Sequence, residues 1–109
     1  MPQILKILGQ SNPSTSTPTT LYTVPASNST VISTITVANL GSTGGAYRIA
    51  CRPAGAALAN SQYISYDTGI GPYDTVGLTL GITLSATDVV TVSSNTGALT
   101  FTAFGSENY

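Results

Sequence analysis

The chain has 109 residues, of which three are Lys or Arg, four are Asp or Glu and none is His. A chain of this length is expected to form one domain, and a net charge of −1 without a basic run argues against nucleic-acid binding. The shortage of charged and imidazole groups also argues against enzymatic catalysis, because general acid–base chemistry depends on such side chains.

The first twenty residues combine a short apolar segment with a tract that cannot build a core. Residues 3–8 predict a strand, and residues 9–20 consist of Gly, Ser, Thr, Asn and Gln with Pro13 and Pro18. Proline biases such a tract toward extended conformations, so we expect an arm. An ordinary long surface loop is the alternative. The expected division is therefore an N-terminal strand and arm over residues 1–20 and a β-sandwich domain over residues 21–109.

From residue 21 onward, apolar and polar residues alternate in short runs separated by Gly, Pro, Ser and Asn. The strands expected on this pattern span residues 21–24, 30–40, 46–52, 62–67 and 75–80, with two more around 90–92 and 99–103. Alternation places Val31 on the same inward face as Ile35 and Val37, and Leu80 on the same inward face as Leu78. Seven or eight short strands predict an all-β fold. We expect a compact antiparallel β-sandwich, immunoglobulin-like or jelly-roll-like, with an extended N-terminal arm.

The few residues with chemical potential have ordinary structural explanations. Cys51 falls on the apolar face of its strand, where a free thiol behaves as a small hydrophobic residue. Asp67 and Asp74 flank a Gly-Pro turn, and Asp88 follows a polar corner, which are positions where Asp bonds its own backbone. We expect no catalytic residue, no metal ligand and no cofactor.

Arg48 and Arg52 lie on the same face of one predicted strand, where two guanidinium groups can bind acids or carbonyls across an interface. Pairing inside the domain with Asp67 or Asp74 is the alternative. Among the tyrosines, Tyr47 is expected in the core, whereas Tyr73 and Tyr109 are expected to be exposed. The candidate interface residues are Ile4, Leu5, Ile7, Leu8, Arg48, Arg52, Tyr73 and Tyr109.

No apolar run approaches the roughly 20 residues of a membrane-spanning helix. The first ten residues do not have the pattern of a secretory signal. A single cysteine is typical of a protein made in the cytoplasm.

Four runs of residues are distinctive together. They are Leu21-Tyr-Thr-Val-Pro-Ala26, Tyr47-Arg-Ile-Ala-Cys-Arg-Pro-Ala-Gly55, Leu80-Gly-Ile-Thr-Leu-Ser-Ala-Thr-Asp-Val-Val-Thr-Val92 and Leu99-Thr-Phe-Thr-Ala-Phe-Gly-Ser-Glu107. Through these runs the chain resembles small virion proteins of tailed bacteriophages, including phages of cyanobacteria. The resemblance implies a β-rich, non-enzymatic component of the virus particle, on the head or the tail.

On this resemblance we expect a capsid decoration (cement) protein that is made in the host cytoplasm and assembles on the virion surface. Its expected partners are copies of itself, as a trimer, and the major capsid protein or other virion proteins. The N-terminal strand would add to the sheet edge of another subunit. The alternatives are a tail or fibre module that binds cell-surface glycan through tyrosines and amides, and an adaptor within the tail.

Overall fold

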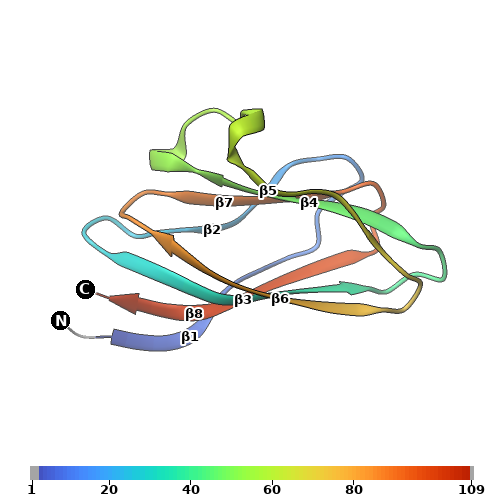
Figure 1. Ribbon diagram of the computed structural model, residues 1–109, viewed down its shortest axis with the longest axis horizontal. Coiled ribbons are helices and arrows are strands. Elements are labelled where there is room, and N and C mark those ends of the chain that lie inside the picture. The colour runs from blue at the N-terminus through green and yellow to red at the C-terminus, as the bar shows by residue number, and fades with distance from the viewer. Residues whose placement is uncertain (1–2, 109) are drawn as a thin grey trace.

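The computed structural model describes residues 3–108, which form two antiparallel β-sheets packed face to face (Figure 1). The strands are β1 (Gln3–Ser11), β2 (Thr19–Thr23), β3 (Ser29–Asn39), β4 (Gly45–Arg52), β5 (Tyr63–Ile70), β6 (Thr75–Leu84), β7 (Val89–Ser94) and β8 (Leu99–Asn108). Two single turns of 3-10 helix, η1 (Pro53–Gly55) and η2 (Asn60–Gln62), connect β4 to β5. The expected all-β sandwich is confirmed.

The order of the strands identifies the kind of sandwich. One sheet has the order β1-β8-β3-β6 and the other has the order β2-β7-β4-β5. The first strand therefore pairs with the eighth, the second with the seventh, the third with the sixth and the fourth with the fifth. This is the pattern of one long hairpin rolled into two layers, which is a jelly roll. Of the two expected subtypes, the immunoglobulin-like one does not have this order.

The core lies between the two sheets and is built by inward-facing residues of the seven strands β2 to β8. Its largest fully buried side chains are Tyr47, Phe101, Ile32, Ile35, Ile49 and Leu99. The rings of Tyr47 and Phe101 meet edge to face across the layers, with centroids 6.1 Å apart. The core position expected for Tyr47 is confirmed, because period-two alternation fixes the face of a regular strand.

Bulges interrupt this alternation along a line across the β1-β8-β3-β6 sheet. Leu8, Ser33 and the pair Leu80–Gly81 are extra residues where the register of β1, β3 and β6 shifts. A bulge changes the face on which the following residues lie. The predictions for two residues are therefore wrong, since Val31 and Leu80 are 37% and 49% exposed. Ile32 takes the inward position instead.

The N-terminal segment belongs to the sandwich. β1 pairs along its length with β8 of the same chain, and β2 begins at Thr19, so only residues 12–18 form a loop. The expected arm over residues 9–20 is corrected to this shorter loop. Gly9 brings β1 against β2, because a Cβ at this position would lie 2.1 Å from the Leu21 carbonyl oxygen. The expected strand over residues 4–8 thus completes its own sheet and leaves its other edge free.

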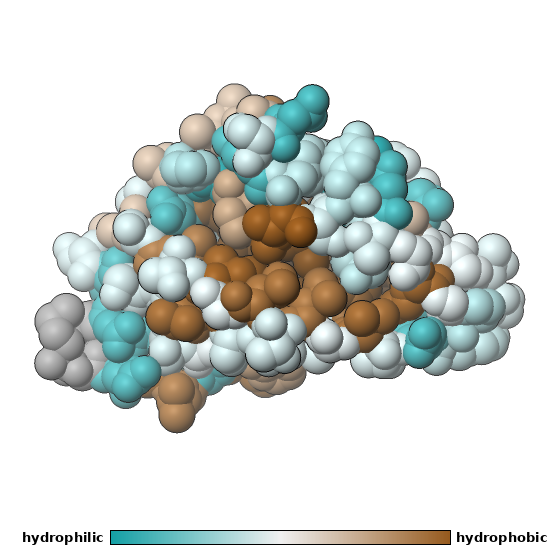
Figure 2. All heavy atoms as spheres, in the orientation of Figure 1, coloured by the Kyte–Doolittle hydropathy of each residue, from teal (hydrophilic) through white to brown (hydrophobic). Residues whose placement is uncertain are grey.

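The opposite side of the sandwich, where β5 and β6 form the sheet edges, is less tightly closed. Figure 2 shows a band of hydrophobic residues between the two layers on this side, along β6. Val76, Leu78 and Ile82 of β6 pack against the core and are only half-buried. This edge therefore keeps apolar surface in contact with solvent.

Candidate functional site

The two outer faces of the sandwich differ in chemistry. Strand alternation places Leu5, Ile7, Val31 and Phe104 on the outer face of the β1-β8-β3-β6 sheet, which we call the docking face. Leu5 is 80% exposed and Ile7 is 54% exposed, so the face carries apolar side chains in solvent. Apart from Leu80 at the β6 bulge, every other strand residue on this face within residues 3–108 is Thr, Ser, Gln, Asn, Ala or Gly. The docking face is therefore free of charge.

The four predicted interface residues of β1 divide between two faces. Leu5 and Ile7 lie on the docking face, opposite Ser106 and Phe104 of β8. Ile4 faces the interior side, opposite the buried Glu107, and Leu8 packs against the core at the bulge. Nothing in the sequence around residues 4–8 marks this division, because all four residues are apolar.

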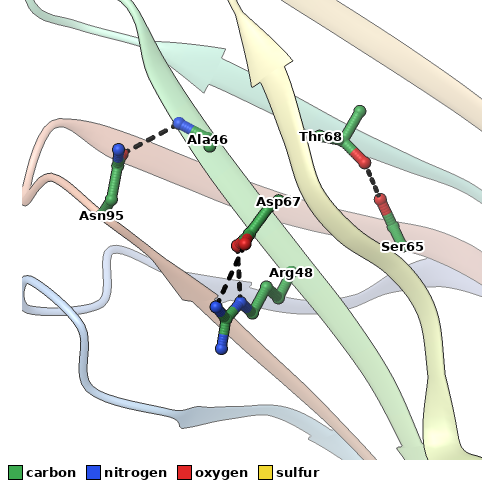
Figure 3. Close-up of polar contacts among 6 residues, drawn as sticks. All are labelled: Ala46, Arg48, Ser65, Asp67, Thr68 and Asn95. Carbon is green, nitrogen blue, oxygen red and sulfur yellow. Dashed lines mark hydrogen bonds and ion pairs between the residues drawn. The ribbon is translucent and has the colours of Figure 1, made fainter. Parts of the chain in front are cut away.

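The outer face of the β2-β7-β4-β5 sheet carries a cluster of polar and aromatic side chains. Nε and Nη2 of Arg48 on β4 donate hydrogen bonds to Oδ1 and Oδ2 of Asp67 on β5, at 2.6 and 3.2 Å (Figure 3). The alternative of pairing inside the domain is thus confirmed for Arg48. The bonds from Arg48 hold the pKa of Asp67 below its usual range, and Asp67 raises the pKa of Arg48.

A bulge on β5 makes this ion pair possible. Tyr47 lies opposite Thr68 and Ile49 lies opposite Ser65, so Tyr66 and Asp67 together face the single residue Arg48. Asp67 has a φ of 50°, in the left-handed region. Asp tolerates this region better than most residues, and bulges often re-aim side chains toward a site. The backbone here turns both Tyr66 and Asp67 toward the guanidinium group.

Two tyrosine rings complete this cluster, which we call the Tyr–Arg cluster (Arg48, Tyr63, Tyr66 and Asp67). The Arg48 guanidinium lies over the ring of Tyr66, with its central carbon 4.0 Å from the centroid. Tyr63 meets Tyr66 edge to face, with centroids 4.9 Å apart. The candidate interface residues expected from the sequence include neither Tyr63 nor Tyr66. A spacing of three puts two residues on opposite faces of a regular strand, and no residue pattern indicates the bulge.

Two hollows flank the Tyr–Arg cluster. One has a volume of about 130 Å³ and is lined by Ser16, Pro18, Ala46, Arg48, Tyr63, Asp67, Ser93, Ser94 and Asn95. The other is lined by Asn60, Tyr63 and Tyr66. A volume of 130 Å³ is well below the 300–1,000 Å³ of sites that enclose a drug-sized ligand. The first hollow is thus too small to enclose such a ligand, and the second, at about 460 Å³, is lined by only three residues, so both suit a ligand that lies along the surface.

The remaining predicted interface residues have different surroundings. Arg52 donates hydrogen bonds to the carbonyl oxygens of Gly55 and Ala56, at 2.9 and 2.7 Å, and so holds the η1 turn of its own chain. Tyr73 is 72% exposed at the turn before β6, as expected. Tyr109 lies outside the described residues.

The other acids and the thiol hold local structure. Asp88 accepts hydrogen bonds from the backbone of Ser85 and of Ala54, so its expected role at the corner is confirmed. Asp74 accepts one from the backbone of Thr75. Cys51 packs partly buried against the core, and burial raises the pKa of its thiol. Across residues 3–108, no three His, Cys, Asp or Glu residues are grouped to hold a metal ion. The same residues contain no helix that is long and apolar enough to cross a membrane.

Fold and surface together define an eight-stranded jelly roll with one charge-free face and one face carrying a Tyr–Arg cluster. No protein-family model, no curated protein and no solved structure matches the chain.

Proposed function

We propose that this protein is a non-enzymatic virion component of a tailed bacteriophage that decorates the capsid surface. The observation that carries the proposal is the charge-free docking face with Leu5 and Ile7 in solvent. Soluble domains normally keep charges on every large surface, which prevents association. A face without charged residues is suited to a permanent interface with another protein. Jelly rolls recur in viral capsid proteins, although the fold alone does not determine a function.

The energetics of burial favour this face over the opposite one. Burying a charged group without a partner costs several kcal/mol, whereas the threonine hydroxyls of the docking face can bond to a partner or to interfacial water. Leu5 and Ile7 each contribute roughly 1.5–3 kcal/mol when they are fully buried. Covering the docking face therefore stabilises a complex without the desolvation of any ion.

The edges of the same sheet support assembly of copies. Four alternating strands make β1 and β6 run in opposite directions. The free edge of β1 in one copy can therefore pair with β6 of another copy in antiparallel register. β6 spans Thr75–Leu84 without a charged residue or a proline, the two features that usually block an edge strand. We propose that the protein assembles as a trimer on the capsid, with the major capsid protein below it.

Binding to capsids emptied of DNA, taken from the phage that encodes the protein, tests the proposal. The purified protein is expected to co-sediment with these capsids and to raise their resistance to heat. The double variant Leu5→Lys/Ile7→Lys is expected to lose binding while keeping its fold. Leu58→Lys is the matched control, because Leu58 is 37% exposed on the loop between η1 and η2, which connects two strands of the other sheet.

The location on the particle decides between the head and the tail. Electron microscopy of virions carrying labelled protein is expected to show density over the capsid shell. Co-purification with detached tails, or equal capsid binding by the double variant and the control, would contradict the decoration role. Tail location would favour the adaptor or fibre alternative.

A further inference from the structure

The side chains of the Tyr–Arg cluster hold one another in fixed positions on the surface. Arg48 is held by two hydrogen bonds to Asp67 and lies against the ring of Tyr66, and Tyr66 is in turn in contact with Tyr63. Each side chain thus fixes the next one. Rigid aromatic and guanidinium groups lose little conformational entropy when a ligand binds.

Two residues that line the hollow of about 130 Å³ also have backbone conformations that non-glycine residues rarely adopt. Asp67 has a φ of 50° and Ser16 has a φ of 54°. The loop that carries Ser16 is fastened to β7, because the Ser16 backbone N–H donates a hydrogen bond to the Ser94 carbonyl at 2.8 Å. Strained conformations of this kind concentrate at ligand sites, where the surrounding structure holds them in place.

The paired charges of the Tyr–Arg cluster favour a neutral ligand over an ionic one. Both carboxylate oxygens of Asp67 accept hydrogen bonds from Arg48, so the two charges compensate each other. The other residues that line the two hollows are Ser, Pro, Ala, Tyr and Asn. Asp67 would repel an anion and Arg48 would repel a cation at close range, whereas neither residue repels a neutral ligand.

The free polar groups match a ligand with several hydroxyls. Within residues 3–108, the side chains of Ser16, Ser93 and Asn60 have no hydrogen-bonding partner, and they line the hollows. Asn95 uses its Oδ1 to accept a hydrogen bond from the Ala46 backbone, which leaves its amide N–H₂ group to donate (Figure 3). Hydroxyls and amides of this kind both donate and accept, as sugar hydroxyls do.

We propose that the Tyr–Arg cluster and its two flanking hollows form a binding site for a neutral oligosaccharide. The tyrosine rings supply apolar surface for the C–H groups of a pyranose ring, and Ser93, Asn95 and Asn60 bond its hydroxyls. The site lies in the open, along Tyr63 and across both hollows, so it takes a chain of sugar units from the side. It occupies the face opposite to the docking face. A protein seated on a capsid by one face thus presents a saccharide site on the other.

NMR titration of the isotope-labelled protein tests the proposal directly. The probes are neutral oligosaccharides of glucose, galactose, mannose, N-acetylglucosamine and N-acetylgalactosamine, together with a sialylated and a sulfated oligosaccharide. At least one neutral probe is expected to shift the backbone amides of residues 63–68 and 93–95. The amides of the docking face are expected to stay unchanged.

Variants then connect any binding to the site. Tyr66→Ala is expected to weaken binding roughly tenfold or more, since it removes a stacking surface and frees the guanidinium. Tyr73→Ala is the matched control, because Tyr73 is an exposed tyrosine on a distant turn. Tyr63→Phe removes only a hydroxyl and is expected to weaken saccharide binding by a smaller factor. It keeps the test available if Tyr66→Ala does not fold.

Three outcomes would overturn the proposal. They are no amide shift with any neutral probe, shifts that Tyr66→Ala leaves unchanged, and tighter binding of an acidic probe than of its neutral counterpart. Capsid binding by Tyr66→Ala is read separately. A variant that binds capsids and loses saccharide supports both proposals, and a wild-type protein that binds saccharide without binding capsids overturns only the proposed decoration role.

Discussion

The hydroxyl of Tyr22 in one sheet donates a hydrogen bond to the buried carboxylate of Glu107 in the other sheet, at 2.5 Å. Glu107 also forms an ion pair with Lys6 at 2.9 Å, and Tyr22 shares a hydrogen bond with the buried Thr30 hydroxyl at 2.9 Å. Glu107 thus joins the two layers through Tyr22 and is paired with Lys6 of its own sheet, at the end of the sandwich where β1 and β8 meet.

Replacing Tyr22 by Phe is expected to lower the free energy of unfolding by about 2 kcal/mol. The ring still fills the core, but Glu107 loses a buried donor, and hydrogen bonds to charged groups are the stronger ones. Urea denaturation followed by circular dichroism measures the loss. Tyr73→Phe is the control, because Tyr73 is exposed, and an equal effect of both variants would show that the cross-sheet bond contributes nothing.

The same pair predicts how stability changes with pH. The bonds from Tyr22 and Lys6 hold the pKa of Glu107 below its ordinary value of 4.5, against the opposing effect of burial. The stabilisation is present above pH 4.5 and is lost as the pH falls through the lowered pKa of the folded state. At high pH, burial and Glu107 raise the pKa of Tyr22 from 10.0 to about 12, so stability falls again across this interval.

Glu107→Gln tests both ends of this pH profile. The variant is expected to flatten the acid side, because a neutral amide does not titrate, and to reduce the alkaline loss, because the pKa of Tyr22 is raised less without the carboxylate. Thermal unfolding measured between pH 2 and pH 12 gives the curves. Asp67→Asn serves as the comparison, since Asp67 has a lowered pKa but is exposed and screened by solvent. A larger change in the pH profile for Asp67→Asn than for Glu107→Gln would show that Glu107 is not the group responsible for the acid side.

Gly105 and Gly77 give a matched pair for the line of bulges. A Cβ at position 105 would lie 2.0 Å from the Val31 carbonyl oxygen and 2.9 Å from the Ile32 Cα, both backbone atoms. Gly105→Ala is therefore expected to destabilise the fold by about 3 kcal/mol. A Cβ at Gly77 meets nothing within 4 Å, so Gly77→Ala is expected to stabilise by about 0.5 kcal/mol. Similar midpoints for the two variants in urea would show that the close approach at Gly105 is not required.

Asp88 is expected to hold two loops together. Its carboxylate accepts hydrogen bonds from the backbone N–H groups of Ser85 and Ala54, at 2.9 and 2.8 Å. Asp88→Ala is expected to cost about 1 kcal/mol, because both bonds are solvent-exposed and contribute modestly. Asp88→Asn keeps one acceptor oxygen and is expected to lie between the wild type and Asp88→Ala. Amide hydrogen exchange at Ala54 and Ser85 reports the local opening.

The all-β class and most of the core could be predicted from the sequence. In regular strands such as β4 and β8 successive residues point to opposite faces, so alternation alone predicts that Tyr47, Ile49 and Phe101 share the interior side of their strands. The prediction failed where a bulge changes the register. Val31 and Leu80 lie at or beside bulges, where a strand carries an extra residue. A bulge depends on how the strand pairs with its neighbour, and the residues of the bulged strand alone do not indicate it.

The candidate surfaces were predicted less completely than the core. The sequence by itself determined that the chain is poor in charge, that it forms β-strands separated by turns and that Arg48 and Asp67 were possible partners. Only the tertiary structure decided that the charged residues leave one whole face free, that β1 completes its own sheet, and that Tyr63 and Tyr66 lie beside Arg48. The physical reason is that alternation is a local property of one strand, whereas pairing order and bulges depend on contacts between strands far apart in the chain.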